Sequence, residues 1–251
     1  MRDVLLAGLL AAATAAVLHA QWIRYPTPGI PRLADGTPNL LAPTPRLAGN
    51  RTDLSGLWGP DLKRGFFDIA TGGVTVPMQP NALALLQERQ ANHAKDHPHA
   101  RCLPLGMPLM VSASMKIIQT PSVVTILYEE ESTFRQVFLD GRKLPDDPQP
   151  TWKGYSIGHW EGDALVIETA GLNAKAWLDQ AGHPQSEALR LTERYTRRDF
   201  GHLTIRITID DPKYYSAAWT VTQEHALMAD DELLENVCLE NEKDADHLTS
   251  K

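Results

Sequence analysis

Residues 201–210 read Gly-His-Leu-Thr-Ile-Arg-Ile-Thr-Ile-Asp, the most regular stretch of this 251-residue chain. Leu203, Ile205, Ile207 and Ile209 alternate there with polar or charged residues. Because successive side chains of a β-strand point to opposite faces, a period of two predicts a strand with one face in an apolar interior and the other in water. The stretch therefore predicts a sheet that covers a core.

Similar runs lie on both sides of this strand and are separated by short breaks. They are rich in β-branched and aromatic residues, and Asp140-Gly141 and Glu161-Gly162-Asp163 are typical of tight turns. The predicted strands cover residues 115–119, 122–129, 133–139, 155–160, 164–169, 187–197, 202–210, 217–226 and 232–239. Most connections are too short for parallel crossovers, so we expect a mainly β fold, an antiparallel meander closed or curled into a barrel.

The N-terminal half carries weaker signals. Asp53-Leu54-Ser55-Gly56-Leu57-Trp58 predicts the start of a short strand. Residues 79–96 predict one helix, because Pro80 stands near its start, apolar residues recur at helical spacing, and Pro98 ends the run.

The composition is that of an ordinary globular protein, with 43% hydrophobic and 22% charged residues. The formal net charge is −7, and the Lys and Arg residues are scattered. A nucleic acid would find no basic stripe to bind, so this class of partner is disfavoured.

The N-terminus has the order of a secretory signal: Arg2, an apolar run from Val4 to Val17, and a small residue at Ala20, after which we expect cleavage. The run is shorter than the roughly 20 residues of a membrane span, although an uncleaved anchor is the alternative. We therefore expect a periplasmic or secreted protein. The predicted organisation is a signal peptide (1–20), a proline-rich arm (21–50), a single barrel-like domain (51–244) and a C-terminal tail (245–251).

The chain has two cysteines, Cys102 and Cys238. After export both would meet an oxidising compartment, so the sequence predicts a disulfide between them. Two buried thiols are the alternative.

Some polar residues fall on the apolar faces of the predicted strands. Glu193 shares a face with Leu191 and Tyr195, and Arg135 shares one with Val137. Burying a charge is costly unless it is paired, so such residues need an explanation. A structural ion pair is one explanation, and a ligand site is the other.

The strand over 217–226 carries a second group of this kind. His225 and Gln223 share a face with Trp219 and Val221. His225 could be a hydrogen-bonded histidine at the rim or an acid-base group. We take Glu193, His225 and Arg135 as candidate catalytic residues, and Gln223, Trp219 and Tyr195 as candidate substrate-binding residues.

A polar loop with Gly and Pro, residues 177–187, contains Asp179, His183 and Glu187. Such a loop could cover the mouth of a barrel, where binding groups are often carried. Asp179 and His183 are therefore further candidate substrate-binding residues, with plain turn chemistry as the alternative.

A histidine cluster follows the predicted helix, with His93, His97, His99 and Cys102 spaced H-x3-H-x-H-x2-C. His93 and His97 are one helical turn apart and could share a metal, but Pro98 breaks the geometry, so a solvated helix end is the preferred interpretation. The chain has none of the strong catalytic or nucleotide-binding motifs, and we expect no metal and no redox cofactor.

Two resemblances follow from these residues. Gly56-Leu57-Trp58 and the meander resemble the lipocalin or calycin plan, which implies a barrel. The stretch Phe134–Arg142, with Tyr155–Asp163, Thr192-Glu193-Arg194 and Ile209–Pro212, is similar to a widespread set of secreted bacterial proteins of no assigned activity. That likeness implies export and fold. Such proteins tend to have a second histidine in the mouth loop, where this chain has Gln185.

Two functions follow as hypotheses. The first is an enzyme of lyase, isomerase or hydratase type that uses acid-base chemistry on a small, partly apolar or aromatic molecule, with Arg135 holding an anionic group. The alternative is a non-catalytic carrier of an apolar ligand, as in other barrels of about eight strands. An interaction module of the cell envelope is a third class, but the sequence gives little sign of the large apolar patch it would need.

Overall fold

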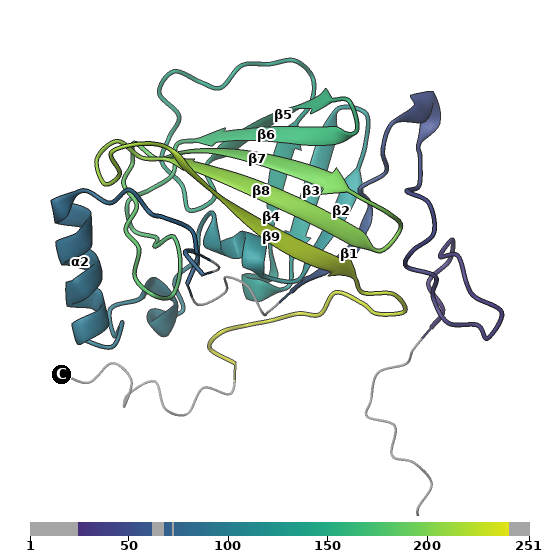
Figure 1. Ribbon diagram of the computed structural model, residues 1–251, viewed down its shortest axis with the longest axis horizontal. Helices are drawn as coiled ribbons and strands as arrows, with labels where there is room; N and C mark the ends of the chain where they lie inside the picture. The colour runs from purple at the N-terminus through teal and green to yellow at the C-terminus, as the bar shows by residue number, and fades with distance from the viewer. Residues whose placement is uncertain (1–24, 62–67, 72, 241–251) are drawn as a thin grey trace, which may run out of the picture.

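The computed structural model describes residues 25–61, 68–71 and 73–240, which form a nine-stranded closed barrel (Figure 1). The strands are β1 (Gly56–Pro60), β2 (Met115–Gln119), β3 (Val123–Tyr128), β4 (Thr133–Phe138), β5 (Tyr155–Glu161), β6 (Ala164–Ala170), β7 (Arg190–Arg197), β8 (His202–Asp210) and β9 (Trp219–Leu227). Each strand pairs with the next along the chain, and β9 pairs with β1. The predicted mainly β barrel is confirmed and is consistent with a lipocalin-like plan.

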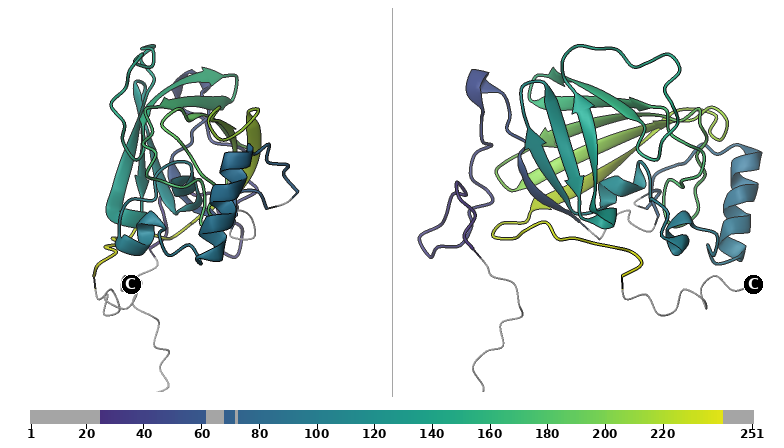
Figure 2. Two further views of the ribbon diagram at one scale, coloured as in Figure 1. Left: turned by 90° about the vertical axis from the view of Figure 1, so that its left-hand side faces the viewer. Right: turned by 180° about the vertical axis from the view of Figure 1, so that it is seen from behind.

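One α-helix, α2 (Pro80–Ala91), lies outside the barrel at one of its ends (Figures 1 and 2). The predicted helix is confirmed, but it ends at Ala91 because His93 and Ala94 adopt positive φ values of 58° and 54°. Four short 3₁₀ helices complete the described elements. They are η1 (Ala48–Asn50), η2 (Pro98–Arg101), η3 (Leu109–Ser112) and η4 (Glu130–Ser132).

One strand pair departs from the expected antiparallel meander. β4 and β5 run parallel, with Val137 opposite Ser156 and Phe138 opposite Ile157. The connection over residues 139–154 is long enough to carry the chain back to the end from which β4 began, which a hairpin cannot do. The barrel is therefore mixed, with a single parallel pair.

The predicted strand over 232–239 is wrong. Residues 228–240 contain no strand, and the segment is fixed by hydrogen bonds between Ser132 and Asn236. The physical reason lies in the closure of the barrel. β9 is hydrogen-bonded to β8 on one side and to β1 on the other, so no free edge is left for a further strand.

The interior follows the alternation seen in the sequence. Leu203, Ile205, Ile207 and Ile209 of β8 are all completely buried, while Arg206 between them is exposed. Burial of such side chains supplies most of the stabilisation of a barrel, at about 25 cal/mol per Å² of apolar surface.

A cation ties the end of β7 to the chain before β1. The Arg197 guanidinium lies 4.8 Å from the centre of the Trp58 ring and donates to the carbonyls of Asp53 (2.7 Å) and Ser55 (3.3 Å). Burial lowers the pKa of Arg197 to about 10, against the smaller effect of Asp53 and Asp199. Trp58 is completely buried, so the Gly-Leu-Trp strand start serves as packing.

The proline-rich arm, residues 25–50 of which are described, packs against the β7–β8 turn. Gly201 donates to the Leu40 carbonyl at 2.7 Å, and a Cβ at position 201 would lie 2.4 Å from that of Leu40. Only glycine permits this approach. Arg32 also forms an ion pair with Asp230 at 2.5 Å. The predicted signal peptide (1–20) and tail (245–251) lie outside the described residues.

The predicted disulfide between Cys102 and Cys238 is confirmed, with a Cα–Cα separation of 5.6 Å. It joins the turn after η2 to the irregular segment that follows β9. In the part of the chain that the structure describes, no helix has both the length and the apolar character needed to cross a membrane.

Candidate functional site

The chain between β6 and β7 folds over the end of the barrel at which α2 lies, and we call this region the α2 end. Trp177 pairs with Pro184 across a tight loop, and the Leu178 amide donates to the His183 carbonyl at 2.9 Å. Arg89 of α2 donates to the Gly182 carbonyl at 2.9 Å. Residues 176–179 and 182–186 are buried, which is unusual for a loop.

Asp179 holds this loop together. Its side chain is completely buried, and its Oδ1 accepts from the amides of Gly182 (2.9 Å) and His183 (3.0 Å). Its Oδ2 accepts from the Ile69 amide (2.9 Å) and from His183 Nδ1 (2.6 Å). Four N–H groups therefore fix the carboxylate in position.

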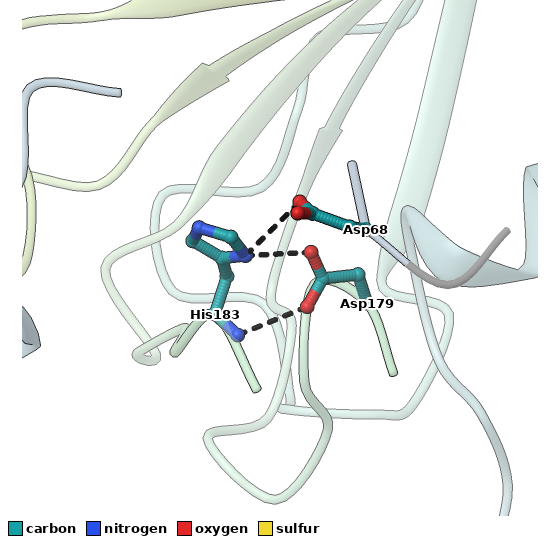
Figure 3. Close-up of side chains that lie close together, drawn as sticks. All are labelled: Asp68, Asp179 and His183. Carbon is teal, nitrogen blue, oxygen red and sulfur yellow. Dashed lines mark hydrogen bonds and ion pairs between the residues drawn. The ribbon is translucent and has the colours of Figure 1, made fainter. Parts of the chain in front are cut away.

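His183 is the residue whose ring is hydrogen-bonded to this carboxylate, and it can act as an acid or a base (Figure 3). Because Asp179 accepts at Nδ1, that nitrogen carries the proton, and Nε2 is left with a lone pair. Figure 3 shows Nε2 on the side of the ring turned away from both carboxylates. Burial lowers the pKa of His183, but the hydrogen bond and the charge of Asp179 together with the charge of Asp68 outweigh it, so the pKa is raised.

Asp68 is the third member of this group. Its Oδ1 lies 3.9 Å from His183 Nδ1, and its side chain is about half exposed. The ligand atoms of Asp68, Asp179 and His183 lie within 4.8 Å of one another, so these residues could offer a site to a metal ion. The 2.6 Å between His183 Nδ1 and Asp179 Oδ2 is a hydrogen-bond distance, however, whereas two ligands of a tetrahedral ion would be about 3.4 Å apart.

Aromatic rings surround His183. Trp219, the first residue of β9, has its ring centre 6.5 Å from that of His183 and 5.4 Å from that of Tyr215. The Tyr215 hydroxyl donates to the Pro184 carbonyl at 2.7 Å. Trp219 is 5% exposed, and its Nε1 has no hydrogen-bond partner among the described residues.

His97 packs from the other side of the loop. Its ring meets the Trp177 ring edge-on, with centres 4.8 Å apart, and Arg89 covers the same indole at 4.0 Å. His97 Nδ1 accepts from the His99 amide at 3.2 Å, so the proton is on Nε2, which is buried without a partner in the described part of the chain. Burial and the neighbouring His99 lower the pKa of His97 to about 4, against a smaller effect of Asp179.

Arg135 and Glu193 meet inside the barrel. Arg135 binds both carboxylate oxygens of Glu193 and also donates to Ser156 (2.9 Å) and Thr169 (2.6 Å). Glu193 further accepts from the Tyr195 hydroxyl at 3.2 Å. Burial opposes the charge of Arg135, but Glu193 outweighs it and raises the pKa of the guanidinium. This is the geometry of a structural ion pair.

His225 and Gln223 contact η3. His225 Nε2 donates to the Val111 carbonyl at 2.9 Å, and Gln223 donates to the Ser112 hydroxyl at 2.9 Å. Burial lowers the pKa of His225 to about 4, so the imidazole is neutral. Six residues of strand separate His225 from Trp219, about 20 Å at the usual rise. The eight candidate residues therefore do not converge at one point.

The sequence identified Asp179 and His183, which the structure places together with Trp219, but Asp68 and His97 were not seen as their neighbours. Asp68 lies 111 residues before Asp179, in a stretch with no clear period. From the sequence, His97 is only a possible metal ligand.

The four residues of the histidine cluster do not come together among the described residues, and His97 is buried rather than solvated. His93 is exposed, His99 pairs with Glu130 at 3.2 Å, and Cys102 is in the disulfide. Two other loop residues have structural partners. Glu187 forms an exposed ion pair with Lys213, and Gln185 donates to the Asn173 carbonyl at 2.9 Å.

Two hollows lie away from this group of residues, both bordered by Leu227 and Met228. One, of about 490 Å³, includes Ser112 and Glu130. The other, of about 380 Å³, lies between the arm and the segment after β9 and includes Arg197.

No protein-family model, no curated protein and no solved structure matches the chain. The roles of the residues at the α2 end therefore follow from their geometry alone.

Proposed function

We propose that this chain is an exported enzyme that moves a proton on a small, partly apolar or aromatic molecule at the α2 end of the barrel, with His183 as the general base. The observation that carries the proposal is the buried pair of Asp179 and His183, joined at 2.6 Å, in which Nε2 is free to accept a proton. A base needs such a lone pair within reach of its substrate.

The surroundings of His183 favour this role. Asp179 fixes the ring and raises its pKa, as a carboxylate does for a catalytic histidine in other enzymes. Among the residues that the structure describes, no serine or cysteine hydrogen-bonds to His183, so proton transfer is favoured over activation of a nucleophile. The reaction class is therefore that of a lyase or isomerase.

This assignment moves the acid-base role away from Glu193 and His225. Glu193 is bound by Arg135 and Tyr195, and His225 donates to a backbone carbonyl. The charge of Arg135 is balanced by Glu193, which leaves little attraction for an anionic group. These three residues would then support the barrel.

Export is part of the proposal. The disulfide between Cys102 and Cys238 supports an oxidising compartment, and the charged, apolar and small-residue order of residues 1–20 supports a signal peptide. Cell fractionation after expression with the native N-terminus, followed by sequencing of the new N-terminus, tests this part.

The activity is tested with the oxidised chain beginning at Gln21 and a panel of ketones, esters, hydroxy acids and alkenes with apolar or aromatic bodies, followed by NMR. His183→Ala should lower turnover at least 100-fold, in the range of general-base catalysis. His159→Ala is the matched control, because His159 is an exposed histidine of β5 that pairs only with surface carboxylates.

Turnover by His183→Ala at the rate of the unmodified chain would overturn the proposal. Native mass spectrometry of protein purified from its own host distinguishes the enzyme from the alternative, a non-catalytic carrier. A ligand that co-purifies and is released unaltered would favour the carrier.

A further inference from the structure

The hollow of about 380 Å³ lies at the end of the barrel away from α2. Its walls come from three parts of the chain: the arm with Pro28 and Ile30, the barrel with Leu57, and the segment after β9 with Leu233. Figures 1 and 2 show the arm and the start of this segment side by side. The volume falls in the range of small-molecule sites, roughly 300–1,000 Å³.

Fixed contacts join the arm to the segment after β9. The Thr27 amide donates to Asp230 Oδ1 at 2.7 Å, and the Asp230 amide donates to the Thr27 hydroxyl at 3.0 Å. Arg32 donates to both oxygens of the same carboxylate, at 2.5 and 3.0 Å. A guest in the hollow would therefore meet walls that are already in place, which lowers the entropy cost of binding.

Two oppositely charged side chains line the hollow and have no partner. They are Lys116 of β2, on the barrel side, and Glu232, on the segment after β9. Among the described residues, neither side chain forms a hydrogen bond or an ion pair, so the two do not pair with each other. A guest that carries one charge of each sign would give both of them a partner.

We propose that this hollow binds an apolar α-amino acid, with its carboxylate paired to Lys116, its ammonium paired to Glu232 and its side chain against the apolar walls. The site is separate from the α2 end and goes beyond the proposed function, because no bond of the guest is made or broken here.

The apolar parts of the walls favour a guest with an apolar body. Leu57 is 7% exposed and Leu227 is 8% exposed, and Ile30, Met228 and Leu233 border the same space. Contact with such surfaces stabilises binding roughly in proportion to the apolar area removed from water. Glycine has the same two charges but no apolar side chain, so it should bind more weakly than phenylalanine.

Arg197 adds a second cation to the barrel side of the hollow. It is 5% exposed and forms no ion pair with a described residue. Its Nε–H, both of its Nη1–H groups and one Nη2–H donate to backbone carbonyls, those of Asp53, Ser55, Asp199 and Phe200. One Nη2–H is left, because a guanidinium has five N–H groups. The barrel side therefore suits the carboxylate of the guest.

The full set of charges favours a zwitterion over a simple anion or cation. Asp231 lies beside Glu232 on the segment after β9, and Asp53 also lines the hollow, with its Oδ1 accepting from the Ser55 amide at 2.8 Å. A guest with only a carboxylate would be repelled by these three acidic groups. A guest with only an ammonium would be repelled by the lysine and the arginine of the barrel side.

The test is a titration of the oxidised chain beginning at Gln21 with L-phenylalanine, followed in proton–nitrogen NMR correlation spectra. We expect saturable shifts of the amides of Leu57, Met228 and Leu233. Two analogues carry the same ring: 3-phenylpropanoate lacks the ammonium, and 2-phenylethylamine lacks the carboxylate. Each should bind roughly threefold more weakly than phenylalanine, as expected for the loss of one partly exposed charge pair.

Lys116→Gln and Glu232→Gln change exposed side chains, so both variants should fold. Each should weaken the binding of phenylalanine roughly threefold. Lys116→Gln should not weaken the binding of 2-phenylethylamine, which has no carboxylate to lose. Glu232→Gln should likewise not weaken the binding of 3-phenylpropanoate. A general disturbance of the hollow would weaken the binding of all three compounds.

Two control variants leave the hollow intact. Lys143→Gln removes an exposed lysine from the connection between β4 and β5, and it should bind phenylalanine as the unmodified chain does. His183→Ala should also bind it unchanged. Trp219, beside His183, and Leu227, beside the hollow, are the two ends of β9, which are about 27 Å apart at the usual rise.

Three results would overturn the proposal. They are the absence of saturable shifts around the hollow, equal affinity for phenylalanine and its two analogues, and loss of phenylalanine binding in His183→Ala. Binding that depends on both charges of the guest and on both Lys116 and Glu232 supports it. The role of His183 as a base is decided separately, by the turnover of the compound panel.

Discussion

Arg135 and Glu193 form a two-pronged ion pair inside the barrel, with side chains that are 2% and 0% exposed. Removing one partner would leave the other charge buried and unpaired, so Arg135→Met and Glu193→Gln should each lower the free energy of unfolding by about 3–5 kcal/mol. Urea denaturation followed by circular dichroism measures this loss.

The double variant Arg135→Met with Glu193→Leu is the informative comparison. It removes both charges and fills the space with apolar atoms, so it should be more stable than either single variant. A single variant that unfolds at the same urea concentration as the unmodified chain would contradict the structural role of the pair.

Asp179→Asn tests the orientation of the base. An amide cannot hold a proton on His183 Nδ1 as a carboxylate does, so Nε2 would more often carry the proton and lose its lone pair. We expect the activity found for the unmodified chain to fall by 10²–10⁴. The ascending limb of kcat/KM against pH should also move to lower pH, because Asp179 raises the pKa of His183.

Asp68→Asn is the control for this change, because Asp68 is more exposed and lies farther from Nδ1. Asp68→Asn should also move the ascending limb of kcat/KM to lower pH, but by less than Asp179→Asn does. An unchanged limb in Asp179→Asn would contradict the proposed part played by the carboxylate.

Much of the fold could be predicted because it follows from local alternation. The apolar face of β8 and the hairpin around Glu161 are encoded in consecutive residues, whereas Asp140-Gly141 follows β4 without forming a hairpin. The parallel pairing of β4 with β5 could not be predicted in this way, because it depends on the path of the long connection. The wrong strand over 232–239 has the same cause: β1, from the far end of the sequence, occupies the edge of β9.

In the candidate site, too, the residues that are close in sequence could be predicted and those brought together by tertiary packing could not. Asp179 and His183 could be identified because they lie four residues apart in one polar loop. Asp68 and His97 reach that loop only through tertiary packing. The alternation did identify Arg135 and Glu193 as inward-facing, but it could not show that each satisfies the other.

His225 makes the stability of the barrel dependent on pH. Its folded pKa is about 4, below the ordinary 6.5, so the unfolded chain binds more protons between these values. The part of the free energy of unfolding that depends on a neutral His225 is fully present above pH 6.5. It falls by about 3 kcal/mol as the pH falls toward 4. In His225→Gln the fall in unfolding free energy over this window should be smaller by about that amount.

Urea titrations at pH 7, 6, 5 and 4 measure the effect. The exposed His159 provides the comparison, since His159→Gln should keep the acid sensitivity of the unmodified chain. Equal slopes for His225→Gln and the unmodified chain would show that other groups cause the loss.

The disulfide closes a loop between residues 136 positions apart. On the chain-entropy model this lowers the entropy of the unfolded chain and stabilises the fold by about 5 kcal/mol at most. Cys102→Ser with Cys238→Ser should therefore lower the free energy of unfolding by several kcal/mol. Mass spectrometry should detect alkylation of the unmodified chain only after reduction.

The barrel itself should survive the loss of this link, because the segment after Leu227 forms no strand and β9 keeps both of its neighbours. The turnover measured with the compound panel should then stay unchanged under conditions where the double serine variant is folded. Ser132→Ala removes only the hydrogen bonds to Asn236 in the same segment and should cost much less, about 1 kcal/mol. A double serine variant as stable as the unmodified chain would contradict the prediction that the disulfide stabilises the fold by lowering the entropy of the unfolded chain.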